Sequence, residues 1–199
     1  MILGQPFSKV INMKNDIVAA VDVLKKGGLI LYPTDTIWGI GCDATNPEAV
    51  AKVYKLKQRV DSKSMLVLME NPSWLNLYLN TVPEIAWDII DIADKPLTII
   101  YPNAKNLAKN LIAFDGSIGI RIVKHLFCEQ LIQSLRKPIV STSANLSGAS
   151  FPKGFHEIDE RIIKGVDYVV PMEYDTALDS TPSGIIQLGI KGEVNVIRK

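Results

Sequence analysis

The sequence predicts an α/β protein (α+β-like) built on a mixed β-sheet. Short apolar runs that are typical of strands are interspersed with segments of helical periodicity, which is the pattern of a sheet flanked by helices. The 199 residues are 47% hydrophobic, which is enough to bury a sizeable core, and they contain no internal repeat. We therefore expect one domain over residues 1–199.

Glycine and proline mark the ends of the first predicted helices and strands. Apolar residues recur at helical spacing over 15–26, and Gly27-Gly28 ends this predicted helix. An apolar strand is expected over 29–32, because Pro33 interrupts regular pairing directly after it. Asn46-Pro47 predicts the start of the next helix, with an N-cap residue followed by proline at the first helical position.

The remaining elements follow from apolar runs bounded by polar or turn-forming residues. Further strands are expected at 65–69, 97–101, 117–123, 138–141, 168–170, 185–188 and 194–197. Further helices are expected at 74–79, 84–92, 126–135 and 157–164. Because strands and helices are mixed along the chain, we expect a mixed rather than a purely antiparallel sheet.

Charge and cysteine content narrow the classes of function. The net charge of +1 gives no overall electrostatic reason to bind nucleic acid or a membrane surface. Cys42 and Cys128 lie in no zinc or redox spacing and are expected to be reduced, buried thiols. The sequence has no signal-peptide pattern and no apolar run of about 20 residues. We therefore expect a soluble cytoplasmic protein.

Three polar segments, far apart in the sequence, can form one site after folding. Lys57-Gln58-Arg59 supplies two cations after a helix, and 141–148 (Ser-Thr-Ser-Ala-Asn-Leu-Ser-Gly) supplies hydroxyl and amide groups after a strand. The segment 33–41 (Pro-Thr-Asp-Thr-Ile-Trp-Gly-Ile-Gly) follows another strand. Cations combined with small hydrogen-bonding groups suit a polyphosphate and a small polar substrate. Arg121 lies in an apolar strand, where a cation needs a carboxylate from the protein or from a ligand.

Several other catalytic patterns are absent from the sequence. Ser143 lies in no G-x-S-x-G context, and neither His125 nor His156 has a spacing that marks it as a base. The glycines at 39 and 41 do not form a dinucleotide fingerprint, and there is no Walker A motif. A nucleotide would therefore bind in a non-P-loop manner, without covalent catalysis by serine.

Six motifs, taken in order, resemble those of the YrdC-like family of threonylcarbamoyl-adenylate synthases. They are PTDT-x-x-G-x-G at 33–41, KQR at 57–59, KPLT at 95–98, GIR at 119–121, STSANLSG at 141–148 and VIR at 196–198. The resemblance covers nearly the whole chain. It implies an open, twisted, mixed sheet flanked by helices (the YrdC-like/DHBP synthase-like fold) in a short, single-domain form of the family.

The resemblance also implies an activity. Family members make L-threonylcarbamoyl-AMP and pyrophosphate from L-threonine, bicarbonate or CO2, and ATP, for threonylcarbamoyladenosine modification of tRNA. Mg2+ is expected on the phosphates, held by ATP and water rather than by a metal site of the protein. Downstream threonylcarbamoyl-transfer proteins are the implied partners.

Individual residues take their expected roles from the same resemblance, position by position. The polar residues characteristic of the family, expected to be catalytic, are Lys57, Arg59, Ser143 and Asn145. ATP-binding positions fall at Arg59, Lys63, Ser117, Ser143 and Arg198. L-Threonine-binding positions fall at Thr36, Arg121, Ser141 and Ser183, with Arg121 pairing the substrate carboxylate.

Two other functions stay open at this point. Residues 51–64 carry five cations against Asp61, a local charge of +4, which would suit a groove for tRNA or double-stranded RNA without catalysis. A carbamoyl-transfer relative that uses carbamoyl phosphate, as in hydrogenase maturation, is disfavoured because no fused zinc-finger or acylphosphatase segment is present. In the synthase interpretation, residues 60–64 are expected to close over the site.

Overall fold

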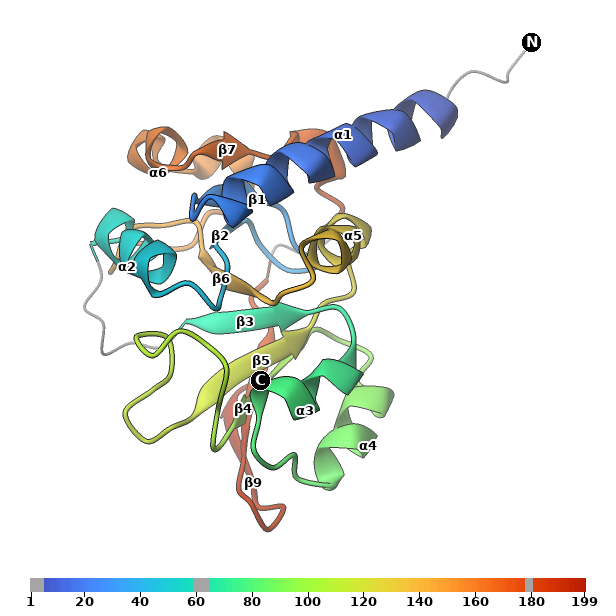
Figure 1. Cartoon of the computed structure of the whole chain (residues 1–199), viewed down its shortest axis with the longest axis vertical. Coiled ribbons are helices and arrows are strands. Elements are labelled where there is room, and N and C mark those ends of the chain that lie inside the picture. The colour runs from blue at the N-terminus through green and yellow to red at the C-terminus, as the bar shows by residue number, and fades with distance from the viewer. Residues whose placement is uncertain (1–5, 59–64, 178–180) are drawn as a thin grey trace.

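One open, mixed sheet runs through the protein in the computed structural model, which describes residues 6–58, 65–177 and 181–199 (Figure 1). Its strands in these ranges are β1 (Ile30–Tyr32), β2 (Gly39–Gly41), β3 (Leu66–Met69), β4 (Leu97–Tyr101), β5 (Ile118–Ile122), β6 (Ile139–Ser143), β7 (Tyr168–Val169), β8 (Gly184–Leu188) and β9 (Val194–Arg198). They lie in the order β7-β1-β2-β6-β3-β5-β4-β8-β9. The β1/β7, β3/β5 and β4/β8 pairs are parallel and the other five are antiparallel. The expected mixed sheet is confirmed.

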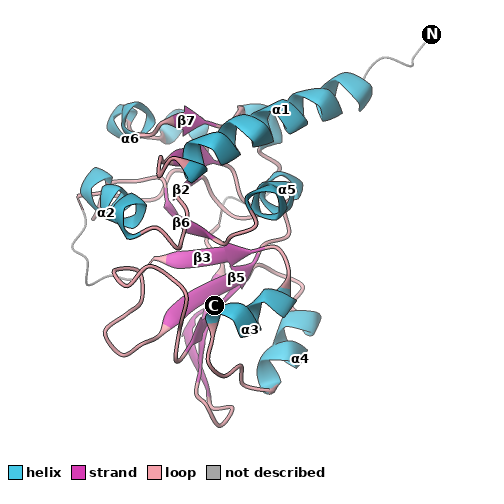
Figure 2. Ribbon diagram, in the orientation of Figure 1, coloured by secondary structure: helices cyan, strands magenta, loops and turns pink. Residues whose placement is uncertain are grey.

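Helices flank this sheet (Figure 2). The α-helices of the described ranges are α1 (Pro6–Lys25), α2 (Pro47–Leu56), α3 (Leu75–Tyr78), α4 (Ile85–Ile92), α5 (Leu126–Leu135) and α6 (Glu160–Gly165), with short 3-10 helices η1 (Pro72–Trp74), η2 (Phe155–Glu157) and η3 (Met172–Tyr174). The predicted start of α2 is confirmed, because the Asn46 side chain accepts hydrogen bonds from the backbone N–H groups of Glu48 and Ala49.

Three elements differ from the expectation. α1 begins at Pro6, well before residue 15, and the helix predicted over 157–164 begins at Glu160, where the Asp159 side chain caps it. β2 was not expected, because glycine disfavours strands. Here glycine is required by close packing: a Cβ on Gly41 would lie 2.7 Å from a ring carbon of Tyr32 and 2.9 Å from the carbonyl oxygen of Val140.

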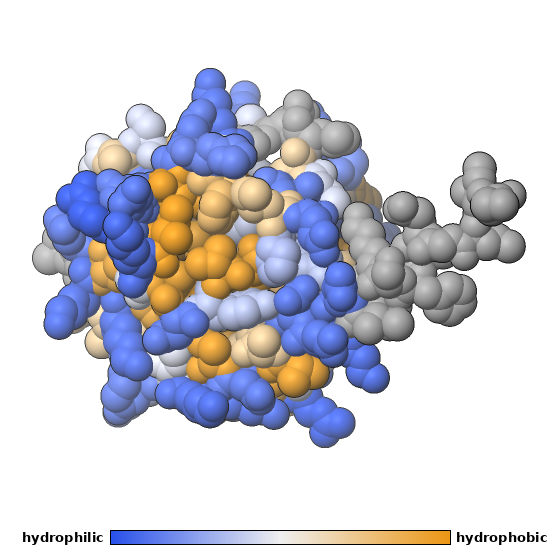
Figure 3. Space-filling model, turned by 90° about the horizontal axis from the view of Figure 1, so that it is seen from above, coloured by the Kyte–Doolittle hydropathy of each residue, from blue (hydrophilic) through white to orange (hydrophobic). Residues whose placement is uncertain are grey.

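The core lies in two clusters, one on each face of the sheet. α1 and α5 pack on one face around Tyr32, Leu68 and Phe127. α2, α3, α4 and α6 contribute to the other cluster, which includes Val67 and Ile120. Figure 3 looks down on the end that carries α1 and α6 and shows apolar side chains bordered by hydrophilic ones.

Polar side chains interrupt the buried surface of β4 and β5. Successive strand residues point to opposite faces. Ile99 and Ile120 therefore join the cluster beneath α3 and α4, while their neighbours Thr98 and Arg121 are buried on the opposite face. Two buried polar residues paired in register across β4 and β5 mark the place where the sheet faces a site rather than a core.

Candidate active site

A cavity of about 310 Å³ opens on the polar side of β4 and β5. Its wall combines residues of β2, β3, β4, β5, β6, β8 and β9 with the turn before β2 and the segment before β8. The lining includes six residues that sequence analysis had assigned to substrates: Thr36, Arg121, Ser141, Ser143, Ser183 and Arg198. Folding thus brings together groups that lie as far apart as residues 36 and 198.

Arg121 is the buried cation of this cavity. Only 3% of its side chain is exposed, and its NH2 group lies 3.0 Å from Oδ1 of Asp35. NH2 also donates a hydrogen bond of 3.4 Å to Oγ1 of Thr34. The Nε–H of Arg121 has no hydrogen-bond partner among the described residues. Asp35 therefore supplies the carboxylate that a buried arginine requires, and its contact leaves the Nε–H of the guanidinium unused.

The turn between β1 and β2 is organised by threonine hydroxyls. Oγ1 of Thr34 donates to the carbonyl oxygen of Ile37 at 2.8 Å and accepts from the main-chain N–H of Thr36 at 3.1 Å. The hydroxyls of Thr34 and Thr36 lie 3.0 Å apart. This Ser/Thr-type turn places Thr36 at the cavity wall and Asp35 beside Arg121.

A second arginine, Arg198, also lines the cavity. Arg198 donates from Nε and NH2 to the carbonyl oxygen of Ser183, at 2.9 and 2.7 Å. The Ser183 hydroxyl is in turn 2.8 Å from the hydroxyl of Thr98. Burial, and then the charge of Arg121, lower the pKa of Arg198 below its ordinary value. The two guanidinium groups repel each other, so an anion between them would be stabilised.

Lys57, Ser143 and Asn145 form one network at the end of β6. Lys57 follows α2 and is 2% exposed. Its Nζ donates to the main-chain oxygen of Ser143, to that of Asn145 at 2.7 Å and to Oδ1 of Asn145 at 3.3 Å. The Ser143 hydroxyl also donates to Oδ1 of Asn145. The buried ammonium therefore holds the end of β6, where Ser143 lines the cavity, together with the loop that follows.

Among the described residues, Lys57, Asn145 and Ser117 were predicted at the site but do not line this cavity. Arg59 and Lys63, like the proposed closing segment 60–64, lie outside the described residues. Ser117 precedes β5 and does not line the cavity; its main-chain N–H donates to Asp115 at 3.0 Å.

Sequence reasoning also missed residues that the fold places at the site. Thr34, Asp35 and Thr98 lie inside the recognised motifs, but nothing in their spacing pointed to Arg121 or Ser183. Phe151 lines the cavity while 40% exposed, and no sequence pattern indicated it. Trp38 also lines the cavity; it is 2% exposed and lies edge-on to Phe155 of η2.

The described part of the basic segment 51–64 gives little support to a nucleic-acid groove. Lys57 is buried, and Nζ of Lys52 donates to the carbonyl oxygen of Gly27 at 2.7 Å. Within the described ranges there is no group of three or more His, Cys, Asp or Glu residues that could hold a metal ion. No helix in those ranges is both long enough and apolar enough to span a bilayer.

Comparison with known proteins identifies the family to which this chain belongs. The family profile Sua5_yciO_yrdC, described as "Telomere recombination", matches residues 22–199. The chain is 33% identical over 160 residues to the threonylcarbamoyl-AMP synthase of Pseudoalteromonas translucida, covering 79% of this chain and 86% of that protein.

Solved structures agree on the fold. Escherichia coli YciO superposes with a TM-score of 0.79 at 24% identity, over 94% of this chain and 89% of that one. P. abyssi Sua5 complexed with L-threonine gives a TM-score of 0.75 at 22% identity, over 86% of this chain and half (50%) of that chain. With a profile match over most of its length and one third identity to a named synthase, the chain belongs to the YrdC/Sua5 family.

Proposed function

We propose that this chain is an L-threonylcarbamoyladenylate synthase, which makes threonylcarbamoyl-AMP and pyrophosphate from L-threonine, bicarbonate or CO2, and ATP. The product would serve threonylcarbamoyladenosine modification of tRNA, and the whole chain would act as one catalytic domain. The observation that carries the proposal is a hydroxyl-lined cavity holding two guanidinium groups, Arg121 and Arg198. The name of the Pseudoalteromonas relative supports the same reaction.

L-Threonine would bind by its carboxylate to Arg121. The unused Nε–H of this side chain is a donor that a carboxylate oxygen satisfies, and charge-assisted hydrogen bonds of this kind are about twice as strong as neutral ones. Thr36, Ser141 and Ser183 line the same cavity and offer partners for the substrate amine and hydroxyl. The L-threonine in the P. abyssi Sua5 structure supports this choice of ligand.

The reaction needs no nucleophile from the protein. The threonine amine adds to CO2 and loses a proton to give a carbamate, and a carbamate oxygen then attacks the α-phosphorus of ATP. The bond from that phosphorus to the bridging oxygen breaks, and pyrophosphate leaves. The protein aligns two anions and offsets their repulsion, which fixed cations and oriented hydroxyls can do. Mg2+ on the phosphates would supply further charge neutralisation.

The remaining residues would act on the nucleotide. Lys57 and Asn145 hold the end of β6, where Ser143 lines the cavity, so we assign them the alignment of ATP rather than proton transfer. Arg198 offers an arginine for the phosphates at the same wall. Arg59, Lys63 and Ser117 stay proposed ATP contacts on the motif match alone.

Mass spectrometry of a reaction with ATP, Mg2+, L-threonine and 13C-bicarbonate tests the proposal. A labelled threonylcarbamoyl-AMP that requires every component is the expected product, and Arg121→Gln should abolish it. Arg161→Gln, which changes an exposed arginine of α6, is the matched control and should retain full activity. ATP binding without any labelled product would contradict the proposal and favour a nucleotide- or RNA-binding role.

A further inference from the structure

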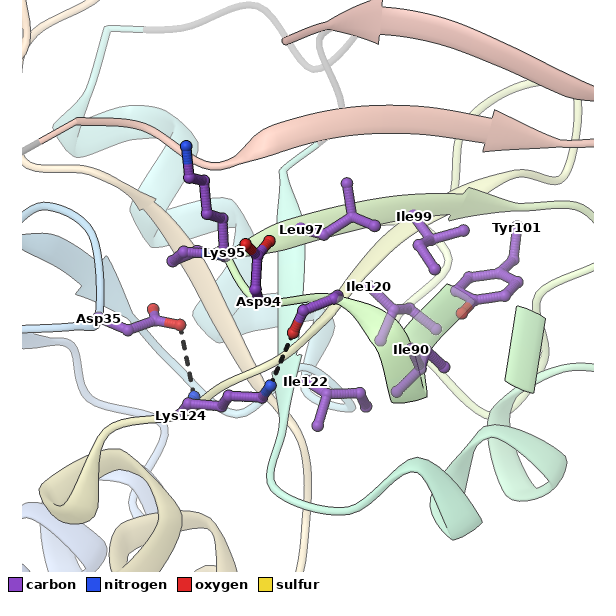
Figure 4. A pocket seen from close by; sticks show the side chains of 12 residues that line it. Asp35, Ile90, Asp94, Lys95, Leu97, Ile99, Tyr101, Ile120, Ile122 and Lys124 are labelled. Carbon is purple, nitrogen blue, oxygen red and sulfur yellow. Dashed lines mark hydrogen bonds between the residues drawn. The ribbon is translucent and has the colours of Figure 1, made fainter. Parts of the chain in front are cut away.

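Asp35 lies between two cavities on opposite faces of β4 and β5. The candidate active site is lined by Thr98 and Arg121, whereas a second cavity of about 260 Å³ is lined by their strand neighbours Ile99 and Ile120. Asp35 lines this second cavity (Figure 4), yet its Oδ1 lies 3.0 Å from Arg121. Asp35 therefore reaches the active-site guanidinium from outside the active-site cavity.

The contacts of Asp35 fix which part of Arg121 is free. Oδ2 of Asp35 accepts a hydrogen bond of 3.4 Å from the main-chain N–H of Lys124, drawn as a dashed line in Figure 4. Asp35 and Thr34 both contact the NH2 group of Arg121. The buried Nε–H has no partner among the described residues, so Asp35 and Thr34 do not use it. A carboxylate that reaches Arg121 from the cavity therefore need not displace Asp35.

The two guanidinium groups of the active-site cavity differ in their charge compensation. Arg121 is paired with Asp35, and both side chains are almost fully buried, at 3% and 8% exposed. Arg198 has no carboxylate partner in the part of the chain that the structure describes, and it donates to a neutral carbonyl group. The first pair is close to neutral, while the second group carries a full positive charge.

We propose that Asp35 is a specificity-determining residue that sorts two anionic substrates between the two arginines. A polyphosphate carries several negative charges, so Asp35 repels it from Arg121, and it binds more favourably at Arg198. A single carboxylate is repelled much less by Asp35, and it gains a charge-assisted hydrogen bond to Arg121. The inference rests on the proposed function, in which the two anions are the threonine carboxylate and the triphosphate of ATP.

Calorimetric binding of inorganic tripolyphosphate and of L-threonine, without ATP or bicarbonate, tests this role apart from catalysis. For the wild type, saturating tripolyphosphate should leave L-threonine binding in place. For Asp35→Asn, the affinity for tripolyphosphate should rise roughly tenfold, and tripolyphosphate should now displace L-threonine. The double variant Asp35→Asn/Arg121→Gln should lose this gain, because the extra attraction comes from Arg121.

Asp94→Asn is the matched control. Asp94 also lines the second cavity but forms no ion pair with another described residue, so its substitution should leave both affinities unchanged. Unchanged tripolyphosphate affinity in a folded Asp35→Asn protein would overturn the inference. Displacement of L-threonine by tripolyphosphate in the wild type would do so as well, even if the variant does not fold. A wild type that binds no L-threonine counts instead against the proposed function.

Discussion

Replacing Lys57 by methionine should destabilise the whole protein, apart from any effect on catalysis. The Nζ group of Lys57 donates to the main-chain oxygens of Ser143 and Asn145 and to the side-chain amide oxygen of Asn145. Methionine keeps an unbranched apolar stem of similar length and removes the ammonium group. Two main-chain carbonyls and an amide oxygen, all at the end of β6, then lose their charged donor.

The magnitude follows from these contacts. A hydrogen bond to a charged group contributes about 1.5–3 kcal/mol, so three of them sum to several kcal/mol. Methionine also removes the cost of burying a charged ammonium group, which offsets part of this loss. We expect a net loss of about 3 kcal/mol in the free energy of unfolding. For a chain of this size that corresponds to a fall in Tm of roughly 6–12 °C.

Urea unfolding followed by circular dichroism measures the change. Lys55→Met is the matched control, because Lys55 is an exposed lysine at the end of the same helix, and its substitution should stay within about 0.5 kcal/mol of the wild type. A loss below about 1 kcal/mol for Lys57→Met would refute the reasoning, because the buried ammonium would then not hold the loop.

Three further outcomes are expected. Gly41→Ala should lower the free energy of unfolding by roughly 1–3 kcal/mol in urea titrations, because the new Cβ would lie 2.7 Å from the ring of Tyr32; a neutral result would show that the ring can move. Thr98→Val should raise KM for L-threonine in the synthase assay more than it lowers kcat, since it removes the hydroxyl that positions Ser183, and an unchanged KM would exclude that role. Burial lowers the pKa of His125 below its ordinary value of 6.5, so the unfolded chain binds the proton more readily and stability should fall as pH drops below about 6.5. His125→Asn should flatten that decline in unfolding titrations at pH 7.5 and 5.5, and an equally steep decline would place its cause elsewhere.

Most of the fold could be predicted from the sequence because most helices and strands are determined by local residue patterns. The cap at Asn46-Pro47, the stop at Gly27-Gly28 and the apolar strands each depend on neighbours within a few residues. β2 escaped prediction because its glycines reflect packing against both neighbouring strands, β1 and the distant β6. Local patterns do not report such contacts.

The site was predictable in its residue types but not in its pairings. Arg121 was expected to need a carboxylate, yet only the folded chain identifies Asp35, 86 residues earlier, as its partner. Thr98 and Ser183 meet across 85 residues of sequence, and neither carries a spacing signal for the other. Motifs identified the polar groups, and the strand order decided which of them meet.

The order of the strands also bears on when the binding site comes into existence. The ribosome synthesises the chain from its N-terminus, so the hydroxyl groups of the β1–β2 turn and of β6 are made before β8 and β9. β8 then has to settle beside β4, bringing Arg198 of the edge strand with it. A nascent chain lacking β8 and β9 can bury much of its core, yet it has only one of the two arginines. Affinity for polyphosphate should therefore be acquired only after β8 and β9 have been synthesised and have paired with β4.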